Sequence, residues 1–185
     1  MSFLKYKKAK IPIDQLDQII EYIDNLDLKW ENSGFGENIF DKNYRLSQHV
    51  WVKDEFVKKF VGTQFESANS DPEWWFDLNG LEDIQYTKYD GTGGHYNWHN
   101  DEVIDSESRV CRKLSTTIML SNSDEYEGGE FQFRSLGRGN VEYETISLEK
   151  GDFLMFPSLL NHRVKPVLKG TRKVLVSWAW GPLFR

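Results

Sequence analysis

Two segments in the second half of the chain carry side chains that could hold a metal ion. His99 and Asp101 are separated by one residue, and His162 begins the later run His162-Arg163-Val164. In an extended strand, residues i and i+2 point to the same face, so His99 and Asp101 can bind one ion while Asn100 points away. Two histidines and a carboxylate on one side of an iron ion leave coordination positions open, so this set predicts a catalytic Fe(II) site.

These residues also allow other interpretations. A histidine two residues from an aspartate occurs often by chance, and the pair can simply be a histidine that is hydrogen-bonded to a carboxylate. His162 favours the metal site, because it adds a third ligand of a suitable type. A closed structural zinc site needs four protein ligands, commonly cysteines, whereas the chain has one cysteine, Cys111. We interpret Cys111 as a buried or unreactive thiol in a protein of a reducing compartment.

One arginine lies in an apolar strand near the end of the sequence. Arg172 alternates with apolar side chains that share its face: Val174, Val176, Trp178 and Trp180. A guanidinium is costly to bury without a partner, and it pairs best with a carboxylate in a bidentate arrangement. That carboxylate can belong to the protein or to a small diacid. We expect a hairpin turn at Lys169-Gly170, which would set Arg172 antiparallel to the strand of His162 and let a five-carbon diacid bridge iron and guanidinium.

The elements that must position these side chains follow from hydrophobic periodicity. Before residue 83, apolar residues recur at helical spacing over Leu16–Leu26 and again over Phe56–Val61. After residue 83, short alternating or β-branched runs predict strands: Ile84–Tyr89, Leu114–Leu120, Phe131–Phe133, Val141–Ile146, Phe153–Phe156, His162–Val167 and Val174–Trp180. Glycine-containing turns separate them, including 91–94, 127–129, 137–139, 150–151 and 169–170. Many short strands of this kind favour a sandwich or jelly roll. We predict one domain over residues 1–185, with helical support over about 1–82 and a β core over about 83–185.

Composition and charge narrow the range of partners. The 185 residues include 39% hydrophobic and 15% aromatic residues, which is enough for a folded core, and the formal net charge is −6. This charge gives no general attraction to nucleic acids or anionic membranes, so we expect neither as a partner. We interpret the basic cluster of Arg109, Arg112 and Lys113 as a solvated face, although it could contact an anion. The sequence has no apolar run long enough to span a bilayer and no secretory signal, so we expect a cytoplasmic protein.

Further motifs follow one another in a fixed order over roughly residues 83–185. They are Tyr89 and Gly91, Tyr96, Leu114-Ser115-Thr116-Thr117, Glu127-Gly128-Gly129-Glu130-Phe131, Gly151-Asp152, Phe156-Pro157-Ser158, His162-Arg163-Val164, Gly170-x-Arg172, and Trp178 with Gly181-Pro182. Together with His99-x-Asp101, they resemble the prolyl 4-hydroxylase-like branch of the 2-oxoglutarate/Fe(II) dioxygenases. The resemblance implies an α+β, mainly β fold: a double-stranded β-helix (jelly-roll) core with N-terminal helices packed against it.

The same resemblance implies roles for individual residues. His99, Asp101 and His162 would hold Fe(II), and Arg172 would bind the distal carboxylate of 2-oxoglutarate. Three further residues resemble positions that line the cosubstrate pocket and one resembles its wall, with core packing as the alternative for the aromatic ones: Tyr89, Tyr96, Thr117 and Trp178. A tyrosine found in some members is replaced here by Met119, so the support for Arg172 is expected from Thr117.

The resemblance also implies a reaction. Fe(II), 2-oxoglutarate and O2 would produce succinate and CO2 and hydroxylate an unactivated C–H bond, most readily that of a prolyl residue in a peptide or protein; ascorbate is a further candidate cofactor. Other substrates stay open: another amino acid, a small molecule or a nucleic-acid base. A second arginine shortly after Arg172, expected in base demethylases, is missing, and the retained Asp101 argues against a halogenase. A non-catalytic jelly-roll binding module is the alternative from another class of protein.

Two interpretations concern residues around this set. We interpret His49 and His95 as ordinary surface or turn histidines, because they match no ligand position. The polar segment 101–112 starts at a proposed iron ligand and has no core-facing period. We hypothesise that it is a lid that becomes ordered when substrate binds, with Trp74 or Trp75 packed under it.

Overall fold

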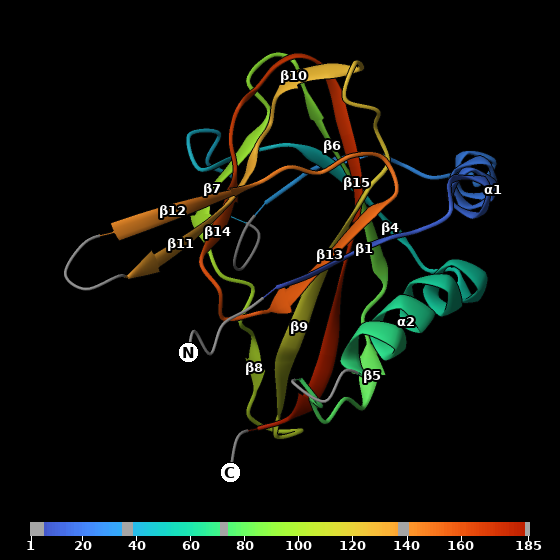
Figure 1. Ribbon diagram of the computed structural model, residues 1–185, viewed down its shortest axis with the longest axis vertical. Helices are drawn as coiled ribbons and strands as arrows, with labels where there is room; N and C mark the ends of the chain where they lie inside the picture. The colour runs from blue at the N-terminus through green and yellow to red at the C-terminus, as the bar shows by residue number, and fades with distance from the viewer. Residues whose placement is uncertain (1–5, 35–38, 71–73, 137–140, 184–185) are drawn as a thin grey trace.

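The computed structural model describes residues 6–34, 39–70, 74–136 and 141–183, and within them two antiparallel sheets pack face to face with two helices on the outside (Figure 1). The larger sheet has the strand order β1-β13-β9-β15-β6-β4-β2, with β5 and β10 also paired to β15 and β8 paired to β9. Its strands are β1 (Lys7–Lys10), β2 (Glu31–Asn32), β4 (Gln48–Val52), β5 (Gly80–Leu81), β6 (Ile84–Asp90), β8 (Ile104–Asp105), β9 (Val110–Met119), β10 (Tyr126–Gly128), β13 (Asp152–Pro157) and β15 (Val167–Pro182).

The smaller sheet has the order β12-β11-β14-β7-β3. Its strands are β3 (Arg45–Leu46), β7 (His95–His99), β11 (Phe131–Leu136), β12 (Val141–Ile146) and β14 (His162–Val164). The two sheets together form the jelly roll, which confirms the predicted mainly β fold. The predicted turn at 137–139 lies outside the described residues.

Both helices cover the outer face of the larger sheet. Helix α1 (Ile13–Asp24) buries Leu16, Ile19 and Ile23, in agreement with the predicted apolar stripe. Helix α2 (Glu55–Asn69) buries Val57, Val61 and Phe65. Its N-terminus is capped by Asp54, whose Oδ1 accepts hydrogen bonds from the N–H groups of Phe56 at 2.9 Å and Val57 at 3.1 Å.

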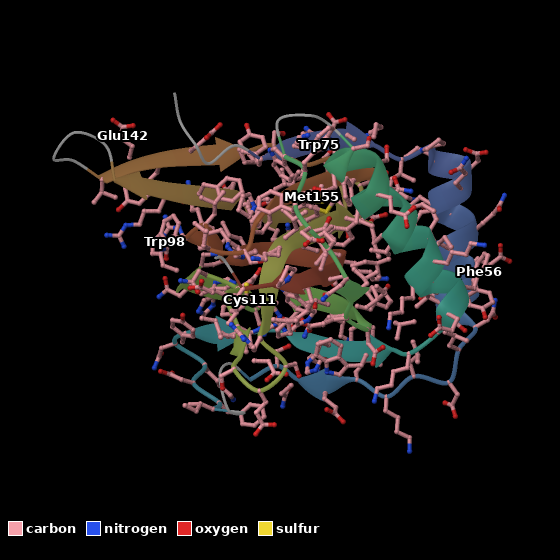
Figure 2. All side chains as sticks on the ribbon, turned by 90° about the horizontal axis from the view of Figure 1, so that it is seen from below. Phe56, Trp75, Trp98, Cys111, Glu142 and Met155 are labelled. Carbon is pink, nitrogen blue, oxygen red and sulfur yellow. The ribbon has the colours of Figure 1, made fainter. Side chains whose placement is uncertain are left out.

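Alternation along the central strands divides the apolar residues into two cores. Ile118 of β9 and Leu175 of β15 pack under the helices, whereas Met119 and Val174, one residue away, face the smaller sheet. Met155 of β13 lies in the helix-side core (Figure 2). The space between the sheets is therefore lined by alternate residues of β9 and β15, and this is the space that holds the candidate site.

Two predictions about the elements were wrong, and a third was incomplete. Phe56 was expected in the apolar stripe of α2, but it is 55% exposed and points outward, in contact with the ring of Tyr22 (Figure 2). The segment before residue 83 was expected to contribute helices, yet it also supplies β1 to β5. These strands escaped prediction because they are short or, like β1 with its sequence KKAK, have no apolar alternation; pairing with a preformed sheet decides their structure.

The hairpin expected at Lys169-Gly170 is absent, since β15 runs without interruption from Val167 to Pro182. Gly170 has a φ of 69° and pairs with Tyr126 of β10, in a position where backbone atoms of Glu125 leave no room for a side chain. The glycine therefore serves a close approach of two strands, not a turn. As a result, β14 and β15 belong to different sheets. Within the described residues, no helix is both long and apolar enough to cross a bilayer.

Candidate active site

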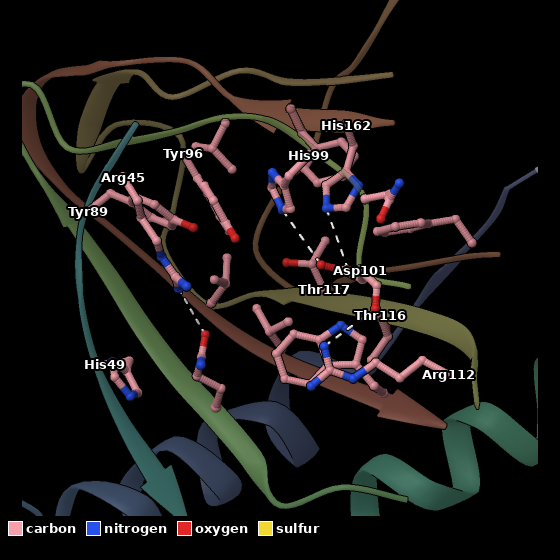
Figure 3. Close-up of a pocket in the computed structure, with 18 of the residues that line it drawn as sticks. Arg45, His49, Tyr89, Tyr96, His99, Asp101, Arg112, Thr116, Thr117 and His162 are labelled. Carbon is pink, nitrogen blue, oxygen red and sulfur yellow. Dashed lines mark hydrogen bonds and ion pairs between the residues drawn. The ribbon is translucent and has the colours of Figure 1, made fainter. Parts of the chain in front are cut away.

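Neighbouring strands of the smaller sheet bring the three candidate metal ligands together (Figure 3). His99 of β7 is paired directly with His162 of β14, and their ring centroids are 4.1 Å apart. Asp101 follows the end of β7, where its N–H donates to the carbonyl of Ser158 at 2.9 Å. Its two carboxylate oxygens each lie 3.6 Å from Nε2 of a different histidine. One ligand atom from each residue lies within 4.8 Å of the others, which is a separation that a single ion can bridge.

Backbone carbonyls fix the orientation of both imidazoles. Nδ1 of His99 lies 2.7 Å from the carbonyl oxygen of Asn97, and Nδ1 of His162 lies 2.9 Å from that of Leu160. A carbonyl can only accept, so each Nδ1 carries the proton and each Nε2 presents a lone pair toward Asp101. This second hydrogen bond is the usual support of a metal-bound histidine.

The electrostatics of the cluster favour a cation. Burial, followed by the neighbouring His162, lowers the pKa of His99 to about 3. Burial by itself raises the pKa of Asp101, but His162 and His99 outweigh it and hold that pKa below its ordinary value. At neutral pH, His99 is therefore uncharged and Asp101 is ionised. A divalent metal ion would supply positive charge beside this buried carboxylate.

Arg172 supplies the second half of the site from the opposite sheet. Its side chain is 1% exposed, and its Nε and Nη2 atoms have no hydrogen-bond partner among the residues that the structure describes. The guanidinium lies 5.5 Å from the ring centroid of Tyr89, and burial lowers the pKa of Arg172. Because a buried cation with unused donors is costly, these donors fit an incoming carboxylate.

The support for Arg172 differs from the sequence prediction. The hydroxyl of Tyr126 lies beside the guanidinium, where it counteracts the lowering of the Arg172 pKa by burial, and it donates to Sδ of Met119, with 4.0 Å between oxygen and sulfur. Tyr126 thus takes the supporting role that we expected of Thr117. No sequence pattern pointed to Tyr126, since it belongs to the short strand β10, whose register with β15 sets the contact.

One cavity of about 370 Å³ joins the two halves. Its walls contain every residue that the sequence assigned to the site: His99, Asp101, His162, Arg172, Tyr89, Tyr96, Thr117 and Trp178. An apolar lining is added by Phe131 and Val164 of the smaller sheet and by Phe156 of β13 in the larger sheet. The cavity therefore combines a hydrophobic interior with a few convergent polar groups, as small-molecule sites usually do.

Sequence reasoning missed a cluster of polar side chains in the cavity wall, which lies away from the metal ligands and consists of Arg45, His49 and Gln85. His49, interpreted as an ordinary surface histidine, is half-buried, and its Nδ1 lies 3.1 Å from Oγ of Ser33. Burial and then Arg45 lower the pKa of His49. Arg45, Ser47 and His49 alternate in the sequence, but β3 and β4 belong to different sheets, so this pattern alone does not indicate a shared cavity.

The basic cluster was also misinterpreted. Arg112 lines the cavity, where its guanidinium lies over the ring of Trp178 at 4.1 Å and Nη1 donates to the carbonyl of Asp101 at 3.4 Å. It forms a two-point ion pair with Glu82, with 2.7 Å between Nη2 and Oε2. Lys113 is buried as well. Only Arg109 and its turn remain at the surface of this segment as expected.

The segment after Asp101 forms a hairpin. Strand β8 pairs with the start of β9, and the N–H of Arg112 donates to the carbonyl of Val103 at 3.0 Å. Val103 lines the cavity and is 43% exposed. Trp74 packs against Phe76 and the helix-side core instead of under this hairpin. Whether the hairpin moves with substrate stays a prediction.

A jelly roll that holds two histidines, a carboxylate and a buried arginine in one cavity is the arrangement expected of a non-haem iron oxygenase. The family model of the 2OG-Fe(II) oxygenase superfamily matches residues 84–180, and the chain belongs to this superfamily. Membership implies Fe(II), 2-oxoglutarate and O2 as cofactors. The donor set and the unpaired Arg172 fit this assignment.

Individual relatives are similar over the same region. A PKHD-type hydroxylase of Delftia acidovorans is 34% identical over 98 residues, which are 51% of this chain and 41% of the relative, so the chain spans less than half of that protein. The crystal structure of a Pseudomonas putida prolyl-4-hydroxylase matches with a TM-score of 0.68 at 17% identity, over 95% of this chain and 92% of that one.

A prolyl hydroxylase from Trichoplax adhaerens, in complex with a peptide fragment of the hypoxia inducible factor oxygen degradation domain, gives a TM-score of 0.69 at 18% identity, over 94% and 82% of the two chains. At these identities, both structures establish the shared fold and nothing more.

Proposed function

We propose that the chain is a 2-oxoglutarate- and Fe(II)-dependent dioxygenase that hydroxylates an unactivated C–H bond, with His99, Asp101 and His162 as the iron ligands. The observation that carries this proposal is Arg172, whose buried guanidinium has unused donors in the cavity of the three ligands. A diacid that binds there with one carboxylate reaches the metal site with the other end. Bound Fe(II) would supply the redox chemistry that couples decarboxylation of this diacid to hydroxylation.

The residues of the chain orient and shield the reactants. The carbonyls of Asn97 and Leu160 keep the Nε2 lone pairs of His99 and His162 directed at the metal position. Arg172 holds the distal carboxylate, and Tyr126 lies beside its guanidinium. The apolar side chains of Phe131, Phe156 and Val164 lower the polarity of the space between, which strengthens each of these polar contacts.

The N-terminal segment contributes to the same unit. Strand β1 pairs with β13, and both helices pack on the sheet that carries Arg172. This supports one domain over residues 1–185, with the helical part acting as a support for the jelly roll.

Peptidyl proline is the substrate that we favour. The support comes from the names of similar proteins, a prolyl-4-hydroxylase and a prolyl hydroxylase bound to a peptide, and it is therefore a fold-level analogy. The net charge of −6 disfavours nucleic acid. Another amino acid or a small molecule is the alternative within the same chemistry.

A screen of succinate formation tests the proposal. The protein with Fe(II), 2-oxoglutarate and O2 is offered proline-containing peptides, free amino acids and oligonucleotides, and succinate is quantified. We expect iron-dependent succinate, with the largest stimulation by a proline-containing peptide that gains one oxygen atom by mass. Absence of 2-oxoglutarate consumption with every substrate, in protein shown to bind iron, would favour the non-catalytic binding module.

A further inference from the structure

Arg45 is a cation in the cavity wall whose hydrogen-bond partners within the described ranges of the chain are all neutral. Its Nε donates to Oγ of Ser47 at 3.1 Å, Nη1 to the carbonyl of Gly34 at 2.9 Å, and Nη2 to Oε1 of Gln85 at 3.0 Å. No carboxylate pairs with Arg45 in the part of the chain that the structure describes. A guanidinium has five N–H donors, so each terminal nitrogen keeps one donor beyond these three bonds.

The position of the guanidinium is fixed by the strands around it. Arg45 of β3 is in register with Tyr96 of β7, and its guanidinium carbon lies 4.3 Å from the ring centroid of Tyr96. Gln85 is buried, and its Oε1 also accepts from Oγ1 of Thr87 at 3.1 Å. Arg45 is therefore held in place before any ligand arrives, which lowers the entropy lost on binding.

The same tyrosine connects Arg45 to the metal site. The ring of Tyr96 stacks on His99 with a centroid distance of 3.5 Å and an interplanar angle of 17°. Arg45 and His99 lie on opposite sides of this ring (Figure 3). The ring of Tyr96 thus separates Arg45 from the candidate iron ligand. A small substrate that binds to Arg45 can extend past this ring and direct its reacting carbon toward the metal position.

The geometry points to a second carboxylate subsite: Arg45, supported by Gln85, receives a carboxylate of the substrate to be oxidised. This inference rests on the proposed function and names the chemistry of its substrate. Arg172, on β15, serves the cosubstrate diacid, so the cavity has one arginine for each of two carboxylates. The substrate carboxylate can be the α-carboxylate of a free or C-terminal residue, or an acidic side chain next to the target residue in a peptide.

Matched acids and amides test this subsite by calorimetry. One arm compares N-acetyl amino acids, N-acetylproline among them, with their amides. The other arm compares the acetylated, amidated dipeptides Asp-Pro and Pro-Asp with Asn-Pro and Pro-Asn. Binding is measured to protein with Mn(II), which does not turn over, and 2-oxoglutarate, and also to metal-free protein. We expect at least one acid to bind about tenfold more tightly than its neutral partner, as charge-assisted bonds allow, and the arm in which it does so identifies the source.

The variant Arg45→Gln should reduce this ratio to about one, whereas Arg134→Gln, which changes an exposed arginine of β11, should leave it unchanged. The inference is overturned if no acid binds more tightly than its neutral partner, or if the ratio survives in Arg45→Gln. If Arg45→Gln binds neither ligand, Arg45→Lys decides. A severalfold lower ratio in Arg45→Lys supports the subsite, and an unchanged ratio or a second loss of both ligands overturns it.

The failure of the proposed function is a separate result. Titration of 2-oxoglutarate into the Mn(II)-loaded wild-type protein, and iron-dependent succinate formation, test the cosubstrate site without reference to Arg45. The metal-free acid and amide titrations report on Arg45 even if that site fails.

Discussion

At the scale of single residues, the site consists of charged groups that lack a partner of opposite charge among the described residues. Asp101 is an ionised carboxylate between imidazole lone pairs, and Arg172 is a buried cation with unused donors. Folding alone would not retain such groups, because apolar residues of similar size would be cheaper to bury. These unbalanced charges support the proposal that Asp101 binds a metal cation and Arg172 a carboxylate.

Asp101→Ala should abolish both iron binding and turnover while the chain stays folded. The substitution removes one of three proposed ligands and leaves the apolar cores untouched. Bound iron per protein, succinate formation and thermal unfolding would be measured together, with Asp124→Ala in an exposed turn as the matched control. Wild-type iron content and succinate production in Asp101→Ala would remove this residue from the site.

Arg172→Lys should weaken the apparent affinity for 2-oxoglutarate by roughly 10- to 100-fold, because it keeps the charge but loses the planar fork and its charge-assisted bonds. A titration of 2-oxoglutarate against iron-dependent succinate formation measures the change. Arg134→Lys at an exposed position is the control. If both variants titrate like the wild type, the diacid binds elsewhere.

At the scale of elements, the link between β10 and β11 packs against Arg172, the proposed cosubstrate arginine. Gly129 has a φ of 68°, and a Cβ there would lie 2.9 Å from Cδ of Arg172 and 2.9 Å from Cγ2 of Val167. Gly93 has a φ of 98° with open space around it. The two glycines share the left-handed conformation and differ in what a methyl group would meet.

Gly129→Ala should weaken 2-oxoglutarate binding by at least about fivefold, since overpacking of about 1–3 kcal/mol falls on Arg172. Gly93→Ala should lower the free energy of unfolding by roughly 1–2 kcal/mol, because alanine is strained in the left-handed conformation. Its affinity for 2-oxoglutarate should stay near that of the wild type. Titration and denaturant unfolding of both variants separate the two effects. Equal losses of affinity would show that backbone strain, and not contact with Arg172, is responsible.

At the scale of the whole molecule, β1 forms one edge of the larger sheet, and a buried carboxylate of β13 helps to hold it there. Asp152 of β13 accepts from Lys8 at 2.9 Å, Lys10 at 3.2 Å and the N–H of Glu149 at 2.7 Å. Burial by itself raises the pKa of Asp152, but the hydrogen bond from Glu149 and the two lysines outweigh it and lower that pKa. Folded protein therefore binds this proton less readily than unfolded protein.

Asp152→Asn should lower the free energy of unfolding at pH 7 by about 1–2 kcal/mol. The stabilisation by a carboxylate with a lowered pKa is complete above its unfolded value of about 4 and is lost as pH falls through the folded pKa. The difference between variant and wild type should therefore shrink in acid. Denaturant unfolding at pH 7 and below pH 4, with Asp124→Asn as control, tests this; a difference that does not depend on pH would contradict it.

The sequence by itself determined which residues could form the site and which class of fold would hold them. The i, i+2 spacing of His99 and Asp101, and the alternation that put Arg172 on a buried face, are local properties of an extended chain. The motif order added the family, which the superfamily match confirmed. The helices α1 and α2 were also readable, because their apolar stripes are periodic.

Only the tertiary structure decided how these segments meet. The sequence around Gly170 is typical of a turn. In the structure, its left-handed φ instead allows the close approach of β10. Without the turn, β14 and β15 belong to different sheets, and His162 and Arg172 face each other from these two sheets. The register of β10 with β15 sets Tyr126 beside Arg172, and the register of β3 with β7 brings Arg45 into the cavity wall. Pairing between distant segments depends on shape and hydrogen bonding across the whole sheet, and a local pattern does not encode it.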